Sequence, residues 1–149
     1  MQRIEVSVMI NRPIEEVFAF AASPENDLQW QSGLLESEQT SEGPMDVGTT
    51  LRQVHKFLGR RIEMDFEVTE YEPNRKASFK NTSGPVQVEA SDIFEPVEGG
   101  TKLTVVIQGE TGGFFKLADP IVARMLKRQT EADLGNLKDL LEAQTAGSA

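Results

Sequence analysis

Four polar side chains are the best candidates for chemistry in this sequence: Gln53, His55, Asn81 and Asp92. By two-residue alternation, each falls on the same face of a predicted strand as a set of apolar residues. A buried polar group without a partner costs about 1–3 kcal/mol, so residues on an inward face need internal partners or a ligand. These four side chains therefore predict the polar contacts of a ligand site.

His55 is the only histidine, and an unperturbed imidazole titrates near neutrality, which makes it the best candidate for a general acid–base residue. The alternatives are a ligand contact, a surface residue and a structural hydrogen bond, because a slip of one residue in strand register would turn it outward. Asp92 would orient the imidazole only if the two strands came together, and we expect them not to be adjacent.

Several familiar catalytic and cofactor sites are not predicted. A single histidine and no cysteine argue against a zinc site, which usually needs three or four ligands. Neither the Gly-x-Ser-x-Gly motif of serine hydrolases nor the Gly-x-x-x-x-Gly-Lys-Ser/Thr loop of nucleotide-binding proteins occurs. We expect no cofactor and no metal.

Alternating apolar and polar residues predict the strands that position these side chains. A first strand runs over Ile4–Ile10, and capping and proline signals predict two short helices, from Asn11-Arg12-Pro13 and from Ser23 to Trp30. A polar edge strand is expected at Leu34–Glu42. The remaining strands are Thr49–Leu58, Arg61–Glu72, Lys76–Thr82, Val86–Pro96 and Thr101–Glu110, followed by one amphipathic helix from about Phe114 to Ala143.

A curved sheet that packs on one long helix leaves space between the two, and inward-facing residues would line it. The apolar residues predicted to form the wall of this space are Trp30, Phe57, Met64, Phe66, Phe79, Val88, Ala90 and Met125. Trp30, at the end of the second short helix, is expected beside the mouth of the cavity. Ordinary core packing is the alternative for each of these residues.

The turns and element ends carry a resemblance to a known family. They include Asn11-Arg12-Pro13, Gly48-Thr49, Glu72-Pro73-Asn74-Arg75 and Gly99-Gly100-Thr101, and the helix end at Asp133–Glu142. Over nearly its whole length the chain resembles the START-like (SRPBCC) superfamily, in its polyketide cyclase/dehydrase-like branch. The resemblance implies an α+β helix-grip fold, in which a curved antiparallel sheet of about seven strands wraps around a long C-terminal helix.

Composition narrows the class of partner. The formal net charge is −9, and such a surface repels nucleic acids and anionic membranes alike. No apolar run approaches the roughly 20 residues of a membrane span, and the N-terminus has no signal-peptide pattern. We expect one cytoplasmic domain covering residues 1–149. Its oligomeric state stays open, a homodimer included.

Three alternative functions stay open, and the resemblance implies the first two. The first is binding of a small hydrophobic or aromatic molecule in the cavity between sheet and helix, and it is the one we expect. The second is a cyclase or dehydratase that uses the same cavity, with His55 as acid–base. The third is an interaction module whose interior is filled by its own side chains.

Overall fold

The computed structural model describes residues 2–57, 59–83, 87–109 and 120–147. The predicted helix start at Phe114 and the predicted strand ends at Leu58, Val86 and Glu110 lie outside these residues. The elements, in chain order, are β1 (Gln2–Ile10), α1 (Ile14–Ala21), the 3₁₀-helix η1 (Pro24–Gln29), β2 (Leu34–Gln39), β3 (Thr50–Phe57), β4 (Arg60–Glu72), β5 (Lys76–Ser83), β6 (Val88–Val97), β7 (Gly100–Gly109) and α2 (Pro120–Gly147).

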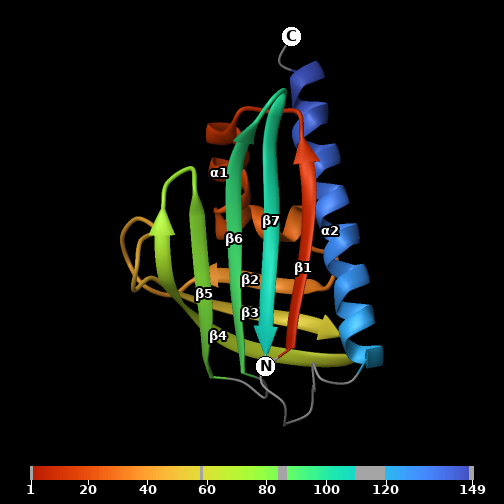
Figure 1. Ribbon diagram of the computed structural model, residues 1–149. Coiled ribbons are helices and arrows are strands. Elements are labelled where there is room, and N and C mark those ends of the chain that lie inside the picture. Colours follow the sequence, from red (N-terminus) through yellow and green to blue (C-terminus); the bar gives the residue numbers. More distant parts are fainter. Residues whose placement is uncertain (1, 58, 84–86, 110–119, 148–149) are drawn as a thin grey trace.

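The strands form one antiparallel seven-stranded sheet in the order β1-β7-β6-β5-β4-β3-β2. Consecutive strands are neighbours from β2 to β7, and β1 closes the series beside β7. The sheet curls strongly, so that β2, β3 and β4 cross beneath the upright strands β5, β6, β7 and β1, while α2 runs alongside β1 (Figure 1). The predicted helix-grip architecture is confirmed.

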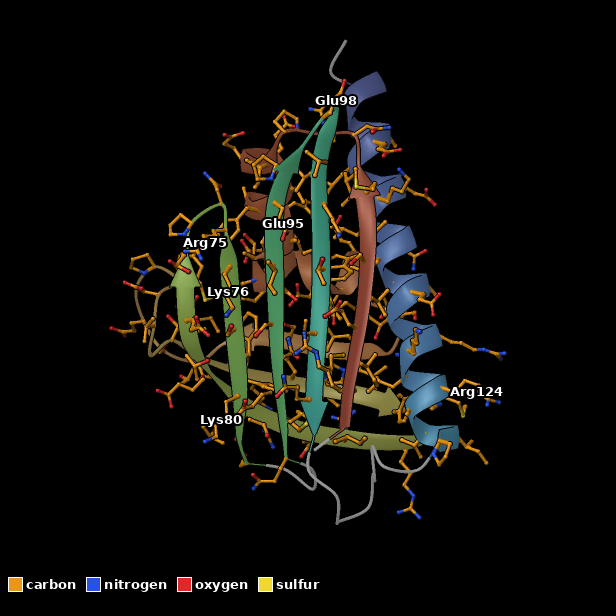
Figure 2. All side chains as sticks on the ribbon, in the orientation of Figure 1. Arg75, Lys76, Lys80, Glu95, Glu98 and Arg124 are labelled. Carbon is orange, nitrogen blue, oxygen red and sulfur yellow. The ribbon has the colours of Figure 1, made fainter. Side chains whose placement is uncertain are left out.

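Strand β4 shows why the sequence folds in this way. Ile62, Met64, Phe66 and Val68 are buried, while the acidic residues between them, such as Glu63, lie toward solvent. This alternation fixes one face toward the interior and one toward water. The same parity holds on β6, so Glu95 lies on the face opposite to the interior; Figure 2 shows it toward the end of β5 that carries Lys76, away from Lys80.

The two short helices lie where the sequence predicts them, but neither has a side-chain cap. Asn11 does not cap α1: the N-cap position is Pro13, and the Asn11 backbone N–H donates to Glu142 Oε2 (2.9 Å). Ser23 is the N-cap residue of η1, with Pro24 in the first turn, as predicted, but its hydroxyl donates to the Ala19 carbonyl (2.7 Å). The second helix is a 3₁₀-helix, with about three residues per turn.

The interior holds two apolar clusters. The larger joins α1, β1, β6, β7 and the C-terminal half of α2, and Phe18 packs edge-on against Phe94 with ring centroids 4.9 Å apart. The smaller cluster belongs to β3 and β4 and consists of Leu51, Ile62, Met64 and Phe66. Val122 of α2 is partly buried against both clusters. The core is therefore divided, and the division leaves room for a cavity.

Candidate binding cavity

A cavity of about 280 Å³ lies between the concave face of the sheet and α2. Its wall comes from the end of α1, from η1, from strands β3 to β7, and from α2 between Val122 and Leu134. Most wall atoms are apolar, and a few polar side chains converge on the same space. That combination is typical of small-molecule sites, whose volumes run from roughly 300 to 1,000 Å³.

Most of the residues predicted as wall residues do line this cavity. They are Trp30, Gln53, His55, Phe57, Met64, Phe66, Phe79, Val88, Ala90 and Asp92. They come from η1's C-terminal end and from β3, β4, β5 and β6, so the alternation of each strand gave the correct face. Strand alternation predicted this placement for all of these side chains except Trp30, which was predicted from its position at the end of the second short helix.

The structure places Asn81 and Met125 away from the cavity wall that the described residues form. Asn81 is buried on β5, where its Oδ1 accepts a hydrogen bond from the Val88 backbone N–H (2.8 Å). It therefore satisfies a backbone group between β5 and β6. Met125 is 43% exposed on α2, because it lies on the helix face turned from the sheet. Neither is a candidate for ligand contact.

A polar chain crosses the cavity wall from β3 to η1. His55 Nε2 lies 2.9 Å from Gln53 Oε1, and because an amide oxygen can only accept, Nε2 carries the proton. Gln53 Nε2 makes longer contacts, each 3.4 Å, to Asp27 Oδ2 and to the hydroxyl of Ser37. His55 is thus linked through one amide to a buried carboxyl group, rather than directly to Asp92.

Sequence reasoning missed Asp27, although it is the most buried acid in the cavity wall. It is 7% exposed, and burial raises its pKa from 3.8 to about 8. The nearby charge of Asp92 raises the pKa further, Glu25 adds a smaller effect, and the hydrogen bond from Ser37 opposes them. Asp27 therefore holds a proton through the neutral range.

Asp92 is the second carboxyl group of the cavity. Its accessible surface opens into the cavity, and burial raises its pKa from 3.8 to about 7. Within the described part of the chain, its side chain has neither a hydrogen bond nor an ion pair. Asp27 and Asp92 therefore form a pair of buried acids that share one apolar space, and Asp92 lacks a polar partner.

The expectation that His55 titrates near neutrality does not fit its environment. Burial lowers its pKa from 6.5 to about 4, so the imidazole is neutral over the physiological range. The groups that change protonation near pH 7–8 are the two carboxyl groups, Asp27 and Asp92. The ordinary pKa values of the side chains favoured the histidine as the acid–base residue. Desolvation reverses that assignment, because it favours the neutral form of every titratable group.

Two further residues of the cavity wall, Asp133 and Trp30, carry polar groups. Asp133 of α2 accepts hydrogen bonds from the Ser32 backbone N–H (2.9 Å) and hydroxyl (2.8 Å), so it anchors the loop before β2. Trp30 is 7% exposed, and its indole Nε1 is buried without a hydrogen-bond partner among the described residues.

A curled antiparallel sheet that grips one long helix over an apolar cavity defines the START-like, helix-grip class of proteins. The chain belongs to the family described as "polyketide cyclase / dehydrase and lipid transport", which matches residues 1–142. A search of curated proteins finds no match. None of the helices in the described ranges is long and apolar enough to cross a membrane.

Solved structures share the fold at low sequence identity. The protein TTHA0849 from Thermus thermophilus superposes with a TM-score of 0.82 at 18% identity, over 96% of this chain and 99% of that one. A START superfamily protein from Mycobacterium smegmatis gives 0.80 at 15% identity, over 95% and 98%. The Zhui aromatase/cyclase from a Streptomyces species gives 0.78 at 15% identity, over 97% and 95%. At these identities the likeness establishes the fold alone.

Proposed function

We propose that this protein binds a small, mainly apolar molecule in the cavity between the sheet and α2. The observation that carries the proposal is the cavity itself, about 280 Å³ of space with a mostly apolar wall and a few converging polar groups. Its volume, near the lower end of the range of small-molecule sites, favours a compact ligand of two or three rings.

The energetics of such binding follow from the wall. Met64, Phe66 and Phe79 offer apolar surface from neighbouring strands, and covering it removes that surface from water at roughly 25 cal/mol per Å². The polar groups of Gln53, Asp27 and Asp92 then orient the ligand. A ligand that displaces water from them without replacing the lost hydrogen bonds binds less tightly. Shape and apolar area supply affinity, and the polar groups supply selectivity.

The test is a search for a ligand followed by a measurement of stability. Native mass spectrometry of the purified protein should reveal a co-purified small molecule. A thermal-shift panel of aromatic polyketides, flavonoids, sterols and fused-ring aromatics should give hits. A ligand at 100 times its dissociation constant should add about 2.7 kcal/mol to the free energy of unfolding. The proposal is wrong if no compound shifts the transition and no small molecule co-purifies.

A second candidate function, acid–base catalysis in the same cavity, is favoured by one observation. Asp27 has a pKa raised to about 8, which suits a carboxylic acid that donates a proton at neutral pH. In this candidate function Asp27 replaces His55 as the acid–base residue, because the ring of His55 is neutral and already donates a hydrogen bond to Gln53. Given a ligand that turns over, Asp27→Asn should lower kcat by roughly 10²–10⁴-fold. An unchanged kcat would exclude Asp27 as the proton donor and would leave ligand binding as the proposed function.

A further inference from the structure

We propose that the cavity selects ligands that carry a protonated amine on an apolar body, with the amine paired to Asp27 and Asp92. This inference rests on the proposed binding function and adds the chemical class of the ligand. It starts from two carboxyl groups, one on η1 and one on β6, that face the same enclosed apolar space.

The first step is that the pair has no cationic partner among the residues that the structure describes. Lys56 also lines the cavity, but it is exposed and makes no ion pair with either acid among the described residues. Asp133 is another acid, already bonded to Ser32, and His55 is neutral. Within the described part of the chain, therefore, the two carboxyl groups have no positive charge to pair with, and a bound cation would supply one.

The second step is that Asp92 lacks any hydrogen-bond donor within the described part of the chain, while Asp27 has the hydrogen bond from Ser37 and the long contact from Gln53. Asp92 therefore keeps its full capacity to accept hydrogen bonds, and Asp27 keeps part of it. An ammonium group supplies up to three N–H donors and a positive charge at once. Hydrogen bonds between two ionised groups are roughly twice as strong as neutral ones.

The third step concerns the protons that the empty pair holds. Burial, with a contribution from the charge of Asp92, raises the pKa of Asp27 to about 8, and burial raises the pKa of Asp92 to about 7, so the empty pair still holds a proton at pH 7. An entering ammonium group, with an ordinary pKa near 10, keeps its proton and reverses the repulsion, so the carboxyl groups release theirs. Binding of an amine should therefore release protons and strengthen as pH rises. The binding of a neutral ligand that accepts a hydrogen bond from a protonated carboxyl group should instead weaken as pH rises.

The whole-molecule charge acts in the same direction. A net charge of −9 raises the local concentration of small cations and lowers that of fatty acids and other anions. Among the groups that face Asp27, Glu25 adds negative charge from the same helix, while Ser37 and Gln53 are neutral. The charged groups that act on this carboxyl group within the described part of the chain, Asp92 and Glu25, are therefore both negative.

Three probes with one apolar body test the inference: 2-(2-naphthyl)ethylamine, 2-(2-naphthyl)ethanol and 2-naphthylacetate. Calorimetric titration of the full chain at pH 8.5 should give the amine an affinity about 10- to 100-fold above the alcohol. The acetate should bind more weakly than the alcohol. At pH 6 the ratio of amine to alcohol should shrink severalfold, and titrations at pH 7.5 in buffers of different ionisation enthalpy should detect proton release for the amine alone.

Matched variants locate the effect. Asp92→Asn should abolish the preference for the amine, so that the ratio of amine to alcohol affinity falls to about one, because the side chain keeps its shape and loses its charge. Glu95→Gln removes the same charge from the outer face of the same strand and should change nothing (Figure 2). If Asp92→Asn does not fold, the same comparison in Asp27→Asn decides.

The outcomes separate this inference from the proposed function. Equal or tighter binding of the alcohol at pH 8.5, or an amine preference that survives both aspartate substitutions, overturns the inference while ligand binding stands. The same holds if an apolar ligand from the thermal-shift panel binds and the amine probe does not. Absence of any ligand in the whole panel overturns the binding function and the inference together.

Discussion

At the scale of single residues, Asp27 shows how position can outweigh residue type. An exposed aspartate in the run Pro24-Glu25-Asn26-Asp27 would be ionised and of no further interest. Buried against Gln53, it holds a proton at neutral pH. The folded state therefore binds a proton between about pH 4 and pH 8 that the unfolded chain has already lost.

This difference gives the pH dependence of stability a defined sign. Wherever the folded state binds more protons, the free energy of unfolding falls as pH rises. Asp27→Asn removes the titration, so its stability relative to wild type should rise between pH 5 and pH 9, by at most about 1.4 kcal/mol per pH unit. Urea unfolding of both proteins at intervals of one pH unit measures this difference in the free energy of unfolding. A difference that stays constant over this range would contradict the burial of a titrating carboxyl group.

His55 should act in the opposite direction over a narrower range. Its pKa is lowered to about 4, so between about pH 4 and pH 6.5 the unfolded chain binds the extra proton and stability rises with pH. In Asp27→Asn this rise should become more visible, because the opposing effect of Asp27 is gone. His55→Gln provides the control, since it should flatten that part of the profile.

Trp30 provides a spectroscopic probe, because it is the only tryptophan and lies in the cavity wall. Its burial predicts an emission maximum shifted to the blue of free indole in water. A ligand in the cavity should change its intensity or wavelength, which fluorescence titration measures. An emission spectrum typical of water-exposed indole, or one unchanged by a saturating ligand, would place Trp30 outside the site.

At the scale of elements, the strands were predictable and η1 was not. Alternation in β4 and β6 is a local signal, so their inward faces could be predicted residue by residue. In η1 and the residue that ends it, the buried positions are Pro24, Asp27 and Trp30, three apart, while Leu28 is 49% exposed. An α-helical interpretation favours Leu28 as the inward residue. A three-residue period, which a run of six residues scarcely reveals, turns Asp27 inward and leaves Leu28 outside.

The two clusters of the core predict different costs for the same substitution. Phe94 packs against Phe18 and lies outside the cavity wall, so Phe94→Ala should cost about 3–5 kcal/mol. Phe66 is buried but lines the cavity, so it has fewer neighbours to lose, and Phe66→Ala should cost about 2–3 kcal/mol.

Denaturant unfolding of both variants makes the comparison directly. Phe66→Ala should also weaken binding of a fused-ring ligand, whereas Phe94→Ala should not, provided that it is measured below its own unfolding transition. Equal losses of stability would mean that Phe66 is packed like any core residue and that the cavity does not extend to β4.

At the scale of the whole molecule, the turns and alternating strands identified the fold, but the size of the cavity was beyond the sequence. Whether inward side chains meet or leave space depends on how far the sheet curls, which no local pattern records. The polar chain from His55 to Asp27 likewise depends on η1 lying against β3, a long-range contact.

The divided core also predicts unequal local stability. The larger cluster ties β1, β6 and β7 to α2, whereas β3 contributes to the smaller cluster beyond the cavity and β2 is an edge strand. Amide hydrogens of β2 and β3 should therefore exchange faster than those of β7, which hydrogen–deuterium exchange measures. A bound ligand should slow exchange in β3 and β4 more than in β7. Uniform protection across the sheet would show that the cavity does not weaken the second cluster.

The pairing of β1 with β7 has a consequence for synthesis on the ribosome. The partners are separated by 91 positions at Ile10–Thr101 and by 107 at Gln2–Gly109. At about 5–20 residues per second, the first strand waits roughly 5–20 s before its hydrogen-bonding partner is even translated. During that time its alternating Ile4, Val6 and Ile10 have no sheet to join. The nascent chain should therefore complete its sheet only after β7 has been translated, and chaperones that shield apolar segments would act on β1 until then.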